Sequence, residues 1–119
     1  MSVILIIEDN PQVCSLIKGE IADLASEFYE GRDGAEAVAL YGKFHPDWVL
    51  MDLEMAQVDG LTATRRIIAE FPTARICIVT NYDDDFLREE AQRAGACGYV
   101  VKEDLQLLRS VLTASKSVH

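Results

Sequence analysis

Three short runs of this chain are almost wholly apolar, and each gives way abruptly to polar residues. They cover residues 3–7, 48–51 and 76–79. Strands that carry apolar side chains at successive positions are typical of a parallel sheet covered by helices on both faces. With two further β-rich runs, the sequence predicts five strands, at 3–8, 26–30, 47–52, 75–80 and 98–102.

Segments with helical periodicity separate the predicted strands. Asn10 precedes Pro11, which places a capping residue before a proline at the first helical position. Asp33, followed three residues later by Glu36, resembles a capping box. The predicted helices begin at Pro11, near Asp33, at Gly60, at Asp83 and at Asp104. Strands that alternate with helices of this length predict an α/β fold with a parallel sheet and right-handed crossovers.

The composition narrows the function classes. A length of 119 residues suits one domain, and a formal net charge of −9 disfavours direct nucleic-acid binding by this domain. No run reaches the roughly 20 apolar residues of a membrane span, and the N-terminus has no signal-peptide pattern. We therefore expect a soluble, cytoplasmic domain that contacts no membrane. Cys14, Cys77 and Cys97 have no metal-like spacing, so we expect reduced thiols in or near the core.

Chemically useful side chains follow the apolar runs. Glu8 and Asp9 follow the apolar run 3–7, and Asp52 follows the run 48–51. Thr80 follows the run 76–79, and Lys102 follows residues 99–101. Because ligands bind at the carboxyl ends of the strands in an open parallel sheet, we expect these side chains to converge on one crevice. Singly, each has a simpler interpretation as a helix-end charge, a turn residue or a solvated cation. Together they predict a site for a cation and an oxyanion.

The same residues carry a resemblance to a known family. The motifs are Glu8-Asp9, residues 51–55 followed by Asp59-Gly60, then Thr80, and Lys102 after Tyr99-Val100-Val101. With these motifs the chain resembles a response-regulator receiver domain over essentially its whole length. Residues 94–102 are most similar to the NarL/LuxR-type branch, which usually carries a DNA-binding domain after the receiver. The resemblance implies a flavodoxin-like (CheY-like) doubly wound sheet of five parallel strands, order 2-1-3-4-5, with five helices.

The resemblance also implies a phosphoacceptor and a metal. Asp52 would be the nucleophile that takes a phosphoryl group from a phosphohistidine of a sensor histidine kinase. Mg²⁺ would bind Asp9 and Asp52 directly, Glu8 through water, and the backbone carbonyl of Glu54.

Further roles follow from the same resemblance. Lys102 and the Thr80 hydroxyl would contact phosphoryl oxygens, and Thr80 with Tyr99 would form the switch. Asn81 and Tyr82 would lie on the rim of the site, where Tyr82 is large enough to shield the phosphoryl group.

The chain departs from the family pattern at two positions. Ala56 stands where a proline usually follows the methionine of the acceptor loop, and Glu103 stands where another usually follows the lysine. The second departure is common in the NarL-type branch. The first leaves the loop from Asp52 to Gly60 less constrained in conformation.

Three alternatives remain at this point. A haloacid-dehalogenase-like phosphatase needs a second aspartate two residues after its nucleophile, where this chain has Glu54. A flavin-binding module of the same fold needs a Ser/Thr/Gly-rich phosphate loop after the first strand, where this chain has residues 8–11, EDNP. A receiver that works without phosphorylation would be expected to lack a site residue, and none is missing.

Residues 1–119 are thus predicted to form a single receiver domain, a phosphorylation-controlled switch and not an enzyme. We expect control of transcription through a DNA-binding domain that would follow His119, with a stand-alone receiver as the alternative. A symmetric receiver homodimer fits the two-fold partners common in such assemblies.

Overall fold

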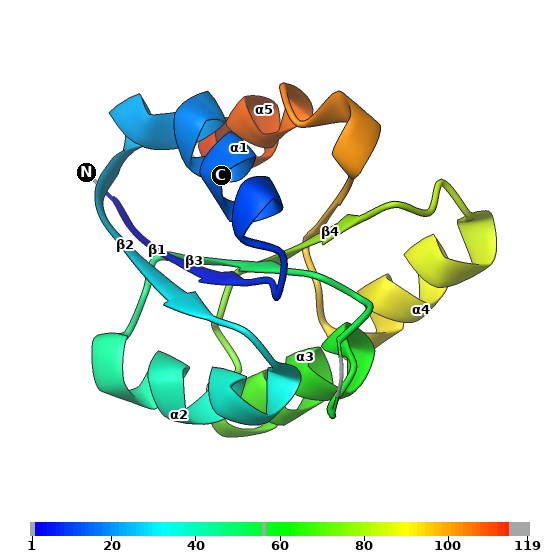
Figure 1. Ribbon diagram of the computed structural model, residues 1–119. Coiled ribbons are helices and arrows are strands. Elements are labelled where there is room, and N and C mark those ends of the chain that lie inside the picture. The colour runs from blue at the N-terminus through cyan, green and yellow to red at the C-terminus, as the bar shows by residue number, and fades with distance from the viewer. Residues whose placement is uncertain (1, 56, 115–119) are drawn as a thin grey trace.

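The computed structural model describes residues 2–55 and 57–114 of the chain. In this range strands and α-helices alternate (Figure 1). The strands are β1 (Ser2–Ile7), β2 (Ala25–Gly31), β3 (Trp48–Met51), β4 (Ile76–Thr80) and β5 (Gly98–Val101). The α-helices are α1 (Pro11–Ile21), α2 (Gly34–Phe44), α3 (Gly60–Glu70), α4 (Asp85–Ala94) and α5 (Leu107–Ala114). Among the described residues, no helix has the length and apolar character needed to cross a membrane.

The strands form one parallel sheet in the order β2-β1-β3-β4-β5, as predicted. Helices α1 and α5 cover one face and α2, α3 and α4 cover the other (Figure 1). Successive residues of β1 enter two separate cores: Ile4 and Ile6 pack toward α1 and α5, and Leu5 and Ile7 toward the opposite layer. All four are fully buried, which confirms that the continuous apolar run is a strand covered on both faces.

The fourth helix begins slightly later than predicted. Three consecutive aspartates precede it, and Asp84 rather than Asp83 is its cap. The Asp84 carboxylate accepts the Leu87 N–H at 2.9 Å, while Asp83 forms an ion pair with Arg88 instead. Both aspartates can cap a helix, and here one caps α4 while the other pairs with a cation.

The fifth helix begins at Leu107, and the prediction that Asp104 opens it is wrong. The chain leaves β5 through a 3-10 turn at Lys102–Asp104, where the Lys102 amine pairs with the carboxylates of Glu8 and Asp52, which follow β1 and β3. The expectation that this helix runs nearly to the last residue concerns residues 115–119, which lie outside the described residues.

The cysteine prediction is correct at two positions and wrong at one. All three thiols are free; Cys14 and Cys77 are buried, but Cys97 is exposed. Cys97 lies just before β5, the edge strand of the sheet, so apolar neighbours in the sequence do not cover it.

Candidate functional site

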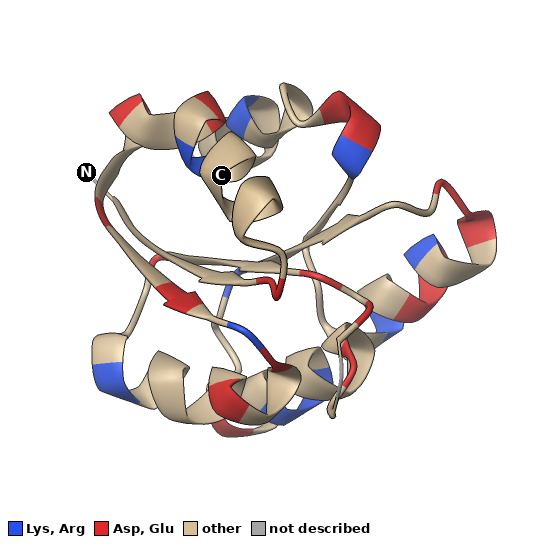
Figure 2. Ribbon diagram, viewed as in Figure 1, with Lys and Arg blue, Asp and Glu red and all other residues tan. Residues whose placement is uncertain are grey.

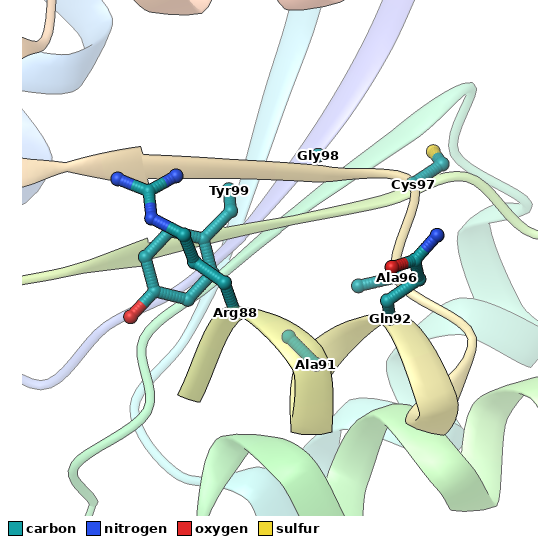
Figure 3. A pocket seen from close by; sticks show the side chains of 7 residues that line it. All are labelled: Arg88, Ala91, Gln92, Ala96, Cys97, Gly98 and Tyr99. Carbon is teal, nitrogen blue, oxygen red and sulfur yellow. The ribbon is translucent and has the colours of Figure 1, made fainter. Parts of the chain in front are cut away.

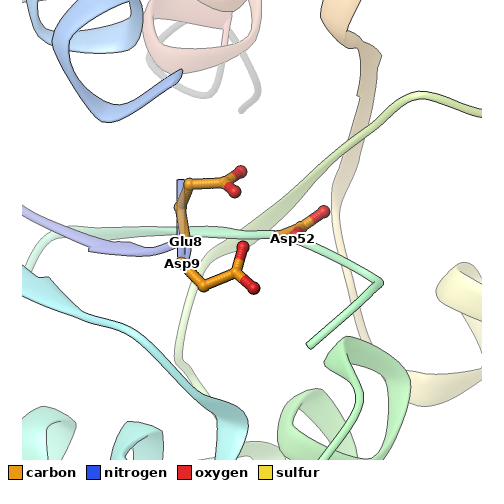
Figure 4. A group of neighbouring side chains, drawn as sticks. All are labelled: Glu8, Asp9 and Asp52. Atoms are coloured by element: carbon orange, nitrogen blue, oxygen red, sulfur yellow. The ribbon is translucent and has the colours of Figure 1, made fainter. Parts of the chain in front are cut away.

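Acidic side chains converge where β1 and β3 end. The two strands pair with Ile7 opposite Met51, so Glu8 and Asp52 leave the sheet side by side. Ligand oxygens of Glu8, Asp9 and Asp52 all lie within 4.8 Å of one another. Glu8 and Asp52 are buried and Asp9 is exposed. Figure 4 shows the three carboxylates close together, and Figure 2 shows acidic residues at the ends of both strands.

Lys102 brings a positive charge to this cluster from the end of β5. Its Nζ lies 2.9 Å from Glu8 Oε1 and 3.2 Å from Asp52 Oδ1, and its side chain is only 14% exposed. One ammonium group cannot neutralise three carboxylates. The cluster therefore keeps an excess of negative charge in a partly desolvated place.

The pKa values in the cluster reflect its burial first and its charges second. Burial raises the pKa of the Asp52 and Glu8 carboxyls above their ordinary values, although Lys102 acts in the opposite direction. Burial alone would lower the pKa of the Lys102 amine, but pairing with Glu8 and Asp52 outweighs burial and raises it. A cation bound among the carboxylates would supply the missing positive charge.

The cluster opens into a hollow of about 430 Å³, which we call the acidic hollow. Its lining residues are Glu8, Asp9, Asn10, Asp52, Glu54, Met55, Asn81 and Lys102. The grouped metal-ligating side chains, Glu8, Asp9 and Asp52, offer only oxygen. An oxygen donor set with few carboxylates and open space for water or phosphate fits a hard cation such as Mg²⁺.

The loop after β4 reaches the opposite side of the acidic hollow through Asn81. Thr80 is buried, and its hydroxyl oxygen accepts the Tyr82 N–H at 3.2 Å. Asn81 lies on the rim. The Tyr82 hydroxyl donates to a Glu54 carboxylate oxygen at 2.7 Å, so it joins the loop after β3 to the loop after β4. This hydrogen bond also raises the pKa of the Tyr82 phenol.

Tyr99 lies on β5, on the face of the sheet that α4 covers. Its hydroxyl donates to the Tyr82 backbone carbonyl at 2.7 Å. The Arg88 guanidinium lies 4.6 Å from the centre of the Tyr99 ring and also pairs with Asp83 at 2.9 Å. Figure 3 shows this pair at one end of a hollow of about 260 Å³ between α4 and β5, with Cys97 at the other end.

Most of the predicted site residues therefore meet in one place. Six of them line the acidic hollow: Glu8, Asp9, Asp52, Glu54, Asn81 and Lys102. Thr80, Tyr82 and Tyr99 do not line it. Tyr82 is hydrogen-bonded to both Thr80 and Tyr99, and its hydroxyl connects them to Glu54 in the lining. Sequence reasoning missed the Glu54–Tyr82 hydrogen bond and the position of Arg88 over Tyr99. No local pattern indicates either contact, because each joins different elements of the fold.

A family model described as the response regulator receiver domain matches residues 4–113. The chain belongs to that family. This membership decides against the haloacid-dehalogenase-like and flavin-binding alternatives. The chain is therefore a signalling switch of the two-component type, and proteins of this class work with sensor kinases.

Two similar proteins show what kinds of protein contain a related receiver. The transcriptional regulatory protein DegU of Brevibacillus brevis is 38% identical over 74 residues, which cover 62% of this chain and 31% of DegU. A protein-glutamate methylesterase/protein-glutamine glutaminase of Myxococcus xanthus is 40% identical over 102 residues, 83% of this chain and 29% of that protein.

The solved structures include a two-component response regulator of the LuxR family from Aurantimonas sp. SI85-9A1. It superposes with a TM-score of 0.84 at 30% identity, covering 96% of this chain and 86% of that one. The predicted likeness to the NarL/LuxR-type branch is thus confirmed. The chain spans less than a third of the length of DegU and of the methylesterase.

Proposed function

We propose that Asp52 accepts a phosphoryl group from a sensor histidine kinase in a magnesium-dependent reaction. The position of Asp52 carries this proposal. The strand order puts β3 between β1, which ends at Glu8 and Asp9, and β4, which ends at Thr80. Asp52 is therefore the one carboxylate of the cluster that lies between the acidic pair and the buried hydroxyl, and Lys102 is 3.2 Å away.

The transfer needs a nucleophile and two groups that receive negative charge. A carboxylate oxygen of Asp52 attacks the phosphorus atom, a P–O bond forms, the P–N bond to the kinase histidine breaks, and the leaving imidazole takes up a proton. The Lys102 ammonium is close enough to stabilise charge on a phosphoryl oxygen. The Thr80 hydroxyl accepts a hydrogen bond from Tyr82, which leaves its own proton for a second phosphoryl oxygen.

Magnesium would supply charge neutralisation for the transferred group. We assign Asp9, Asp52 and the backbone carbonyl of Glu54 as direct ligands. Both oxygens of the Glu8 carboxylate have protein partners, Lys102 at Oε1 and the Asn10 N–H at Oε2, so we assign Glu8 a contact through water. The all-oxygen donor set and the raised pKa of the buried acids support this assignment.

The test is phosphoryl uptake from a small acyl phosphate, with and without Mg²⁺. Asp52→Asn should abolish uptake, and Asp9→Ala should weaken Mg²⁺ binding. Asp47→Asn is the matched control, because Asp47 precedes the same strand at its opposite end and binds the Val3 N–H instead. Undiminished uptake by the Asp52→Asn variant would contradict the assignment.

We further propose that phosphorylation changes the surface formed by α4, β5 and α5. Phosphoryl binding would draw the Thr80 hydroxyl inward, and the Tyr82 backbone, which contacts both Thr80 and Tyr99, would carry the change to β5. Residue-resolved spectra with and without beryllofluoride test this step. Residues 83–112 should respond in the parent, and the response should be lost in Thr80→Ala.

For the protein that contains this domain, we propose a cytoplasmic transcription regulator with a DNA-binding domain after the receiver. The likeness to DegU and to a LuxR-family regulator supports this output. We propose that the receiver itself turns over no metabolite and forms a homodimer when phosphorylated. The full reading frame decides between this output and a stand-alone receiver, and sedimentation with and without beryllofluoride tests the dimer.

A further inference from the structure

A residue of the β2–α2 connection holds the loop between β3 and α3. The Asp33 carboxylate accepts the Gln57 N–H at 2.7 Å through Oδ2 and the Val58 N–H at 3.1 Å through Oδ1. The same Oδ1 accepts the Ala35 N–H at 2.8 Å and so caps α2. One side chain thus joins the start of α2 to a loop 24 residues further along the chain.

Close backbone packing brings these groups together. A Cβ atom on Gly34 would lie 2.4 Å from the Val58 carbonyl oxygen, so the start of α2 touches the loop through backbone atoms. At the far end of the loop, a Cβ atom on Gly60 would lie 2.1 Å from the Asp52 carbonyl oxygen, and the Gly60 N–H donates to the Leu53 carbonyl at 3.0 Å. The loop is fixed where it begins and ends, and Asp33 holds the part between.

That part of the loop is weakly constrained by its own sequence. It contains Ala56 at the position where the family usually has proline, so the unfolded chain has more conformations to lose there. Hydrogen bonds from amides to a carboxylate are stronger than those to a neutral acceptor. The amides of Ala35, Gln57 and Val58 lower the pKa of the Asp33 carboxyl, so these hydrogen bonds favour the ionised carboxylate.

We propose that Asp33 is a positioning residue for metal binding and phosphoryl transfer. By holding Gln57 and Val58, it keeps the Glu54 carbonyl and the Asp52 carboxylate in the arrangement that the cation requires. This inference rests on the function proposed above. Groups that orient metal ligands without touching the metal typically change affinity or activity by tenfold or more.

Substitutions at Asp33 separate its two roles. In Asp33→Ser, the short side chain can still cap α2 but cannot reach Gln57. In Asp33→Asn, one acceptor oxygen remains, so part of the contact with the loop is kept. The matched control is Asp84→Ser, because the Asp84 carboxylate caps α4 by accepting the Leu87 N–H.

Four measurements distinguish positioning from simple capping: the Mg²⁺ dissociation constant by calorimetry, the initial rate of phosphoryl uptake, hydrogen exchange at the amides of residues 57 and 58, and the melting temperature. We expect Asp33→Ser to weaken Mg²⁺ binding and slow uptake by about tenfold, and to speed exchange at both amides. Asp33→Asn should fall between this variant and the parent. Asp84→Ser should match the parent in Mg²⁺ affinity and uptake.

Two results would overturn the inference. One is Mg²⁺ affinity and uptake in Asp33→Ser within about twofold of the parent, even if the melting temperature falls. The other, should the serine variant fail to fold, is an Asp33→Asn variant that binds Mg²⁺ as the parent does. A parent that neither binds Mg²⁺ nor takes up phosphate would instead refute the proposed function, and this inference with it.

Discussion

Where β1 and β3 end, the Glu8 and Asp52 carboxylates are buried, at 3% and 5% exposed. Lys102, which reaches them from the end of β5, has a side chain that is only 14% exposed, and Asp9 is the exposed member of the cluster. On the β4–α4 side, Tyr82 is 44% exposed and holds Glu54 by one hydrogen bond. Breaking a buried ion pair leaves an uncompensated charge, whereas water replaces an exposed hydrogen bond at little cost. The charges on the first side are therefore costly to rearrange, whereas the side-chain contacts on the second side can change at little cost in free energy.

This difference separates two properties of a receiver. In the proposed function, acceptance of a phosphoryl group depends on the buried charges, because they create the negative site that a cation would complete. We propose that the lifetime of the group, and the transmission of its arrival, depend on Tyr82 and on its contacts with Glu54, Thr80 and Tyr99. Substitutions on the two sides should accordingly have effects of different size and kind.

The largest effect on stability is expected from Lys102→Met. It leaves Glu8 and Asp52 buried without a cation, and removal of one partner of a buried pair costs roughly 3 kcal/mol. Lys18→Met is the control, because Lys18 pairs with Glu30 on the surface, where ion pairs contribute about 1 kcal/mol or less. Chemical denaturation without metal would measure both. Equal losses of unfolding free energy in the two variants would mean that burial does not distinguish the sites.

A smaller effect, of opposite sign, is expected from Asp52→Asn in metal-free buffer. The pKa of Asp52 is raised, so the folded protein holds this proton more tightly than the unfolded chain. The contribution of Asp52 to stability is therefore present at low pH and lost as pH rises through the folded pKa. The variant should exceed the parent in unfolding free energy at neutral pH and approach it in acid.

Magnesium should reverse that order, because it binds and stabilises only the protein with the ionised carboxylate. Melting curves of the two proteins, with EDTA and with Mg²⁺ across the acid to neutral range, would measure both effects. A parent that is the more stable protein in EDTA at neutral pH would contradict the electrostatic description of the buried side.

The smallest effect is expected at Tyr82. If its ring shields the phosphoryl group, Tyr82→Ala should speed the loss of phosphate about fivefold, which corresponds to roughly 1 kcal/mol in activation free energy. Tyr82→Phe keeps the ring and loses the hydrogen bond to Glu54, so its rate should lie nearer to that of the parent. Dephosphorylation followed after removal of the phosphodonor gives the rates. Rates for Ala and parent within about twofold would refute shielding.

The sequence predicted the buried side of the site better than the contacts of Tyr82. The apolar runs predicted the strands, and the polar residues that follow them predicted the acidic hollow, because parallel strands bring their carboxyl ends to one edge. Asp52, Asp9 and Lys102 were found in this way. Their positions depend on strand length, which the sequence pattern indicates, and on strand order, which the resemblance to the receiver family implies.

The contacts that Tyr82 and Asp33 make with distant residues were not predictable in this way. The hydrogen bond from Tyr82 to Glu54 spans 28 residues, and the Asp33 contact to Gln57 spans 24. Glu36 illustrates the same limit, because its carboxylate accepts the Arg32 N–H instead of closing the predicted capping box on Asp33. Its neighbours in the sequence indicate only that Asp33 caps a helix. The packing of α2 against the loop between β3 and α3 gives Asp33 its further partners.

The most direct test of the account is to locate the phosphoryl group on the unmodified sequence. The protein would be treated with a small acyl phosphate in Mg²⁺ or in EDTA, digested in acid, and analysed by tandem mass spectrometry. The account predicts modification at Asp52 in Mg²⁺, little or none in EDTA, and none at Glu8 or Asp9. Modification at another residue, or equal modification of Asp52 without metal, would contradict it.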